Sequence, residues 1–159
     1  MDNTRNYLQV LSESLDKKLI ILNELQKVTD EQRKLAQADK LDGEAYDTTI
    51  DKKEPLIDEL AKLDNGFQLL YDNIKDQVDS NRQLYTAEIK TLQAKIKLVL
   101  DKSASLQVAE AHNKELISNK FASIRKEIRQ VKKSRSTAAN YYKTMNNITS
   151  EAYFLDQKK

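Results

Sequence analysis

Only two glycines and one proline occur in this chain of 159 residues. Sheet proteins need frequent turns, and glycine and proline are the residues that most effectively form turns and end helices. A chain so poor in both is expected to form long helices within one domain. The sequence therefore predicts an all-α fold, an antiparallel bundle of long helices that resembles a coiled-coil hairpin and carries a projecting C-terminal helix.

Apolar residues recur at intervals of three and four along the first part of the chain, which is typical of one face of an amphipathic helix. The stripe begins after Thr4, and a helix is expected to end near Ala38 because Asp42-Gly43 follows as a turn. The stripe consists of Leu8, Leu11, Leu15, Ile21, Leu22, Leu25, Val28 and Leu35.

Pro55 lies in the middle of the next helical pattern, and a proline is tolerated in a helix chiefly within the first turn. We therefore expect a short helix around Tyr46 and a new helix that begins near Lys53 or Glu54. Gly66 lies within that new helix and is expected to mark a close helix crossing. The eight residues expected to form the bundle core are Leu8, Leu11, Leu15, Leu60, Leu63, Phe67, Leu92 and Ile96.

A turn is expected at residues 79–81, where the sequence Asp-Ser-Asn groups cap-forming residues. The apolar stripe then continues to Val131 without a glycine or proline, which predicts a fourth helix of about 50 residues. Such a helix would be about 75 Å long, against about 50 Å for the first helix. The end of the fourth helix should then project beyond the bundle, and an unpaired amphipathic helix needs a partner or self-association.

The formal charge of +2 conceals an uneven distribution. Residues 1–113 carry 16 Lys and Arg against 21 Asp and Glu, whereas residues 114–159 carry 11 against 4. The sequence therefore predicts a body over residues 1–113 and a basic partner-binding region over residues 114–159 of the same domain. A basic helix can bind nucleic acid, an anionic membrane or an acidic protein, or it can serve solubility alone.

The sequence offers little for catalysis or metal binding. There is no cysteine, and His112 is the only histidine. No Glu-x-x-His pair and no glycine-rich phosphate loop occurs, so no enzyme activity, cofactor or metal site is predicted. No run of 18 apolar residues is present and the start lacks the pattern of a signal peptide, which predicts a cytoplasmic protein.

Apolar and aromatic side chains gather among the cations of the last third of the chain. Tyrosine and methionine are enriched at the centres of protein interfaces, so this region is expected to bind a protein. The expected partner-binding residues are Phe121, Ile124, Ile128, Val131, Tyr141, Tyr142 and Met145, with the flanking cations Arg125, Arg129, Lys132, Lys133 and Arg135. Whether the first four of them belong to the core instead stays open.

The segment KKEPLIDELAKLDNGFQLLYDNI (residues 52–74) follows a long amphipathic helix and a short Asp-Gly turn. This arrangement, with YYKTM and FLDQKK near the C-terminus, resembles the FlgN-like flagellar export chaperones over essentially the whole chain. The resemblance implies a small helical chaperone that binds hook–filament junction proteins through its C-terminal region and delivers them to the export gate or its ATPase.

Three alternatives stay open at this point: another helical flagellar chaperone of the FliT kind, a homo-oligomeric coiled-coil adaptor, and a nucleic-acid-binding helical protein. The nucleic-acid alternative rests on the basic region, but no reading helix or basic repeat with interleaved aromatics supports it.

Overall fold

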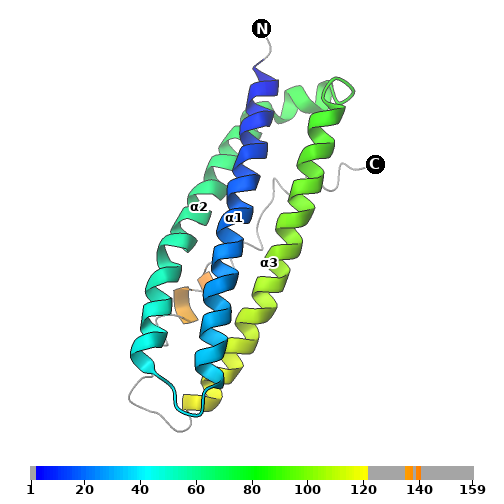
Figure 1. Ribbon diagram of the computed structural model, residues 1–159. Coiled ribbons are helices and arrows are strands. Elements are labelled where there is room, and N and C mark those ends of the chain that lie inside the picture. Colours follow the sequence, from blue (N-terminus) through cyan, green and yellow to red (C-terminus); the bar gives the residue numbers. More distant parts are fainter. Residues whose placement is uncertain (1–2, 122–134, 138, 141–159) are drawn as a thin grey trace.

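The computed structural model describes residues 3–121, 135–137 and 139–140. It contains three long helices, α1 (Thr4–Gln37), α2 (Gly43–Ser80) and α3 (Thr86–Phe121). α1 packs against both other helices and lies between them in Figure 1. α1 and α3 run in the same direction and α2 runs in the opposite one. The prediction of an all-α bundle is confirmed for the described residues.

The predicted C-terminal ends of α1 and α2 agree closely with the observed ones. α1 ends at Gln37, one residue before the predicted end, and α2 ends at Ser80, inside the predicted turn. α2 begins after Asp42, whose carboxylate accepts a hydrogen bond of 3.0 Å from the Ala45 N–H. This bond satisfies one of the amides that a helix leaves without a partner in its first turn.

The predicted division of the second helical pattern at Pro55 is wrong, because α2 is continuous and contains Pro55 in its interior. A proline cannot donate to the carbonyl of the residue four positions earlier, here Asp51. Both residues are exposed, so water can satisfy that carbonyl. The residues around Tyr46 and those at Lys53 and Glu54 therefore belong to one helix.

Gly66 does not mark a close crossing between the helices that the structure describes. A Cβ atom placed on this glycine would meet nothing within 4 Å. The predicted crossing is wrong, and the packing of the described chain does not require a glycine at this position.

Ten of the twelve buried positions of α1 are spaced alternately by four and three residues, which is the heptad pattern of coiled coils, and Ser12 and Val28 are the other two. In α1 these positions are Thr4, Leu8, Leu11, Leu15, Lys18, Leu22, Leu25, Thr29, Gln32 and Ala36. In α2 they are Tyr46, Ile50, Lys53, Ile57, Leu60, Asp64, Phe67, Tyr71, Ile74 and Val78, of which Ile57 and Asp64 are half-buried. The third set starts just before α3 and comprises Tyr85, Ile89, Leu92, Ile96, Val99, Ser103, Leu106, the half-buried Glu110, Asn113 and Ile117.

α1 and α3 are aligned in parallel with a constant offset. Thr29 donates a hydrogen bond of 3.0 Å to Glu110, 81 residues later in the chain. The same offset of 81 residues relates all the heptad positions of α1 to those of the third set. Nearer the N-terminus, Lys95 donates a bond of 2.6 Å to Ser12, in agreement with this register.

α2 is aligned with α1 in the antiparallel direction. Lys18 and Asp64 form an ion pair with Nζ and Oδ1 2.7 Å apart. Thr29 lies 11 residues after Lys18 and Lys53 lies 11 residues before Asp64, and both contact the same oxygen of Glu110. The heptad positions therefore stack in ten layers, each with one residue from every helix.

Polar layers divide the core into two apolar clusters. The larger cluster extends from Leu8 to Leu106 across the three helices, and the smaller one lies beside the α1–α2 loop. The smaller cluster contains Ala36, Leu41, Tyr46, Ile50 and Ile117. Of the eight predicted core residues, seven are buried and Leu63 is half-buried.

The polar layers contain buried groups that require partners. Lys53 is buried and its ammonium contacts the Glu110 carboxylate, while burial lowers the pKa of Lys53 to about 7. In the next layer Asn113 donates a hydrogen bond of 2.8 Å to the Thr29 carbonyl. Partners of this kind are needed because an unpaired polar group costs free energy when it is buried.

Candidate partner-binding region

The predicted partner-binding residues fall mostly outside the described part of the chain. Phe121 is the last described residue of α3, without a described side chain. The others, which stay predictions, lie outside the described residues: Ile124, Arg125, Ile128, Arg129, Val131, Lys132, Lys133, Tyr141, Tyr142 and Met145.

Arg135 is described, and it lies beside the C-terminal half of α3. Its guanidinium donates a hydrogen bond to the Ser118 hydroxyl and lies 3.5 Å from the Lys114 carbonyl oxygen. A helix that continued straight from Ser118 would place residue 135 about 25 Å further along the axis. The expectation of one straight, projecting helix is therefore wrong, because the chain has returned to α3 by Arg135.

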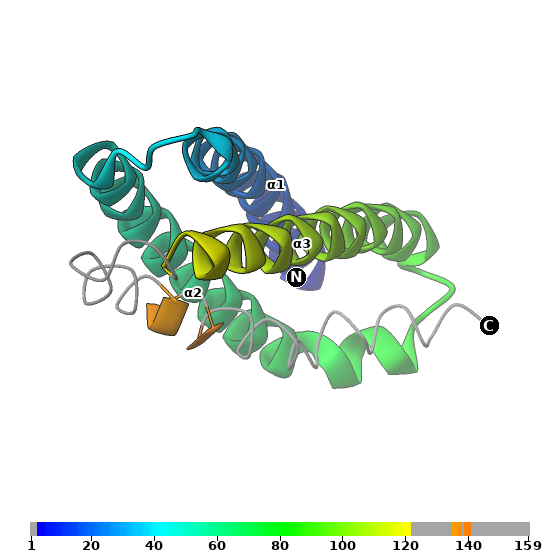
Figure 2. The same ribbon diagram turned by 90° about the horizontal axis from the view of Figure 1, so that it is seen from below.

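The surroundings of Arg135 include α2 as well as α3. Burial raises the pKa of Tyr46 on α2 to about 12, and the charge of Arg135 acts against this increase. In Figure 1 residues 135–137 and 139–140, drawn in orange, lie in the half of the bundle nearer to the α1–α2 loop, and Figure 2 shows them beside α2. The described residues 135–137 and 139–140 of the basic region therefore lie at this end of the bundle.

The end of the bundle beside the α1–α2 loop is closed by contacts of α3. Lys120 donates hydrogen bonds to the carbonyl oxygens of Ala38 and of Asp39, the latter at 3.1 Å. Ile117 is buried in the smaller apolar cluster. α3 thus crosses the predicted boundary at residue 113 without interruption, and its last turns contribute to the same packed structure as residues before that boundary.

An acidic row follows one flank of α2. Its five members are spaced at multiples of seven residues and are all exposed, and they are Glu44, Asp51, Asp58, Asp72 and Asp79. The neighbouring Lys52 forms an ion pair of 3.2 Å with Glu31 of α1. Successive helical residues are about 100° apart, so the row lies on the flank of α2 that faces away from α1.

Asp47 lies one turn from Asp51, a member of this row, and the negative charge of Asp51 affects its carboxyl group. Burial raises the pKa of the Asp47 carboxyl, and the charge of Asp51 raises it further. Asp47 follows Tyr46, the residue on which Arg135 acts. The flank of α2 that carries the acidic row is therefore a region of negative potential, which favours cationic side chains.

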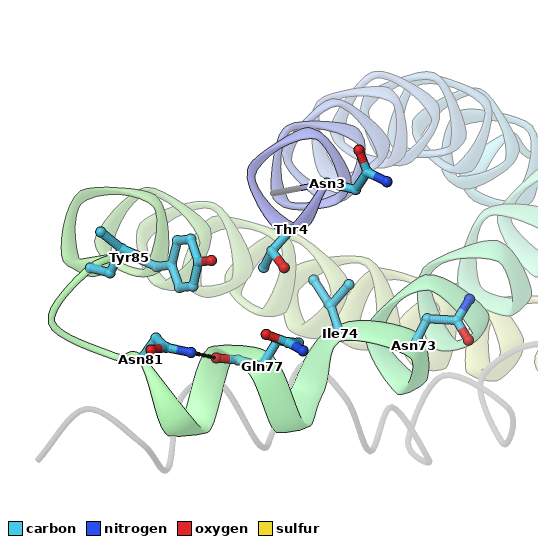
Figure 3. A pocket seen from close by; sticks show the side chains of 8 residues that line it. Asn3, Thr4, Asn73, Ile74, Gln77, Asn81 and Tyr85 are labelled. Atoms are coloured by element: carbon cyan, nitrogen blue, oxygen red, sulfur yellow. Dashed lines mark hydrogen bonds between the residues drawn. The ribbon is translucent and has the colours of Figure 1, made fainter. Parts of the chain in front are cut away.

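A pocket of about 480 Å³ lies at the opposite end of the bundle, between the start of α1 and the α2–α3 turn (Figure 3). Its exposed rim carries four carboxamides and one leucine, and these are Asn3, Asn73, Gln77, Asn81 and Leu84. Its floor consists of the buried residues Thr4, Ile74 and Tyr85. Sequence reasoning missed this pocket, because its residues come from three separate segments.

The residues that the structure describes gather in no group of three or more His, Asp or Glu side chains suited to a metal ion. His112 is exposed on α3. No helix among the described residues is long and apolar enough to cross a membrane.

Long heptad-packed helices, with Arg135 held against α3, define an all-helical bundle in the described part of the chain. The sequence model of a family described as FlgN protein matches residues 1–147. The chain belongs to the FlgN family and is a flagellar export chaperone, as the resemblance implied. No curated protein and no solved structure matches the chain.

Proposed function

We propose that this chaperone binds hook–filament junction proteins in the cytoplasm through residues 114–159 and holds them unassembled until export. The observation that carries the proposal is the charge and composition of this region, which has 11 Lys and Arg against 4 Asp and Glu and ends in an aromatic cluster. The membership of the chain in the FlgN family supports the same function.

The apolar residues of this region have the spacing of a binding helix. Ile124 and Val131 follow Ile117 at steps of seven residues, so their spacing continues a heptad row of α3. A partner's amphipathic helix could place its apolar face against such a stripe, with Arg125 and Arg129 beside acidic residues of the partner. Delivery then requires a contact with the export gate or its ATPase.

Arg135 gives the described structure a direct connection to this region. It is held by Ser118, and its charge acts on Tyr46 of α2. Substrate helices that carry acidic side chains would compete with the acidic flank of α2 for the cations of the basic region. Attraction between the cations and this flank would keep the region close to the bundle, and an acidic substrate would release it by competition.

The test is co-expression of the chain with candidate hook–filament junction proteins and with the filament cap protein, followed by co-purification. We expect a junction protein to co-purify with the full chain and not with a chain that ends at Phe121. Co-purification of the cap protein alone would assign the chain to a different chaperone subclass, and retention of a junction protein by the shortened chain would place the binding site on the bundle.

The same purified protein tests two further alternatives, a nucleic-acid-binding protein and a homo-oligomeric coiled-coil adaptor. Binding through several phosphate contacts weakens steeply as salt rises, whereas an apolar helix groove changes far less. The homo-oligomeric adaptor would be favoured if the mass in solution equals that of two chains at every concentration of a dilution series.

A further inference from the structure

The pocket at the α2–α3 end of the bundle differs in chemistry from the rest of the surface. One residue in three of this chain is charged, yet none of the described residues that line the pocket is a Lys, Arg, Asp, Glu or His. Its rim presents the carboxamides of Asn3, Asn73, Gln77 and Asn81. Figure 3 shows these side chains around the mouth of the pocket, with Ile74 and Tyr85 between the helices.

The walls of the pocket are held in place by contacts of the surrounding residues. Arg5 lies over the Tyr85 ring, with its guanidinium carbon 5.5 Å from the ring centre, and donates a hydrogen bond of 2.9 Å to the Leu84 carbonyl. Its charge also meets Glu88 at 3.5 Å. The charge of Arg5 is thus paired with Glu88, which does not line the pocket.

The α2–α3 turn is fixed by its own hydrogen bonds. The Leu84 N–H donates to the Asn81 carbonyl at 2.9 Å, and the Asn81 side-chain amide donates to the Gln77 carbonyl at 3.0 Å. A site whose walls are already ordered loses little entropy when it binds a ligand.

Carboxamides recognise a particular kind of ligand. Each carries an N–H donor pair and a carbonyl acceptor, the same groups as a peptide bond, so it can donate to and accept from an extended peptide backbone. An ionic ligand meets no counter-charge among the described residues of the lining, so its charge gains no partner there. A volume of about 480 Å³ is within the range of small-ligand sites and suits a few residues of peptide.

We propose that this pocket binds a short uncharged peptide segment of a second protein, with one aliphatic side chain against Ile74 and Leu84. α1 has 34 residues and spans about 50 Å, so this site and the neighbourhood of Arg135 lie at opposite ends. A partner at the pocket and a substrate at the basic region can therefore be bound together. The inference does not depend on the identity of the substrate.

Three capped tripeptides test the proposal: acetyl-Gln-Leu-Gln-amide, acetyl-Glu-Leu-Glu-amide and acetyl-Lys-Leu-Lys-amide. Each is titrated into the full-length ¹⁵N-labelled chain while the side-chain amide resonances are followed by NMR. We expect the glutamine peptide to shift the amide signals of Asn73, Gln77 and Asn81 in a saturable way, and the two charged peptides to bind at least several-fold more weakly.

Two variants and a control distinguish the pocket from other surfaces. Asn73→Asp with Gln77→Glu adds charge, and Asn73→Ala with Gln77→Ala removes the carboxamides without adding charge. Each lost hydrogen bond should weaken binding roughly two- to tenfold. Asn23→Asp with Asn65→Asp makes the same charge change at exposed sites elsewhere and should leave binding unchanged.

Failure is equally well defined. The inference is overturned if the glutamine peptide causes no saturable shift at millimolar concentration, if the shifted signals lie away from the pocket, or if the charged peptides bind equally well. The substrate co-purification experiment is unaffected by any of these outcomes, so the two proposals fail separately.

Discussion

Lys53 of α2 and Glu110 of α3 form an ion pair inside the bundle, although they are 57 residues apart in the chain. Their side chains are 6% and 15% exposed. Thr29 of α1 donates to the same carboxylate oxygen, so one layer joins all three helices through a charged group. A pair so placed contributes to the choice of register, because its charges are satisfied in one alignment of the helices only.

Removal of one member of this pair should destabilise the protein strongly. At pH 6, Glu110→Leu leaves the Lys53 ammonium buried without its carboxylate, and we expect a loss of about 2–4 kcal/mol in the free energy of unfolding. The double variant Lys53→Met with Glu110→Leu should recover most of it. Urea denaturation measures both.

The neighbouring exposed pair provides the control for this experiment. Lys52 and Glu31 are each about half exposed, so Glu31→Leu should change the stability by less than about 1 kcal/mol. Equal effects at Glu110 and Glu31 would contradict the structural role of the buried pair.

The stability of the protein should rise between pH 7 and pH 9 because of Lys53. Burial lowers its pKa from 10.5 to about 7. Between these values the unfolded chain keeps a proton that the folded chain has released, so raising the pH favours the folded chain. We expect the free energy of unfolding, measured by thermal or urea denaturation, to be about 1–2 kcal/mol higher at pH 9 than at pH 7. This increase should be absent in Lys53→Met. A wild-type profile parallel to that of the variant would count against this titration.

Gly66→Ala should stabilise the protein by about 0.5–1 kcal/mol. Glycine in a helix interior is less favourable than alanine by about this amount, and the added Cβ meets nothing within 4 Å. The measurement is the urea midpoint at constant slope. A decrease in stability would indicate that a further chain packs closely against this position in solution.

Truncation should show where the packed bundle ends. A chain that stops after Phe121 keeps Asn113, Ile117 and Lys120 with their contacts, so it should unfold cooperatively with nearly full helicity. A chain that stops after Ala111 loses the buried Ile117 side chain and should be less stable by about 2–4 kcal/mol. Circular dichroism and urea melts of the two chains test this, and equal stability would show that the last turns of α3 are dispensable.

Tyr141→Ala with Tyr142→Ala should weaken substrate binding by about 2–4 kcal/mol if the aromatic cluster contacts the substrate. Calorimetric titration with a co-purifying junction protein gives the affinity, and a melting curve of the free variant gives its stability. Tyr7→Ala is the matched control, since Tyr7 is a partly exposed tyrosine of the bundle. Unchanged binding would remove these tyrosines from the site, and a lowered melting temperature would place them in the fold.

The sequence predicted those features that depend on local composition. The ends of α1 and α2 and most of the apolar core follow from cap residues and from spacings of three and four. The continuity of α2 was missed, because the cost of Pro55 depends on whether Asp51 is exposed to water. That exposure is a property of the packed bundle and cannot be read from neighbouring residues.

The polar layers were missed for a related reason. Lys18, Lys53 and Thr29 look like surface residues in any short window, although they fall on the heptad positions of their helices. The offset of 81 residues between matching heptad positions is visible in the sequence once the spacing of the three stripes is compared. The contact between Arg135 and Ser118 could not be predicted from such a spacing, since it depends on the path of the chain beyond α3.

The ten stacked layers also limit how this molecule can respond to its partners. If α2 slid by one heptad along α1, the ammonium of Lys18 would face Ile57 or Tyr71 instead of Asp64, and a buried charge would lose its counter-ion. Ratchet motions by whole turns, which some helical switches use, are therefore closed to this bundle. We therefore expect the bundle to act as a spacer of fixed length, which connects partners at its two ends without sliding of its helices.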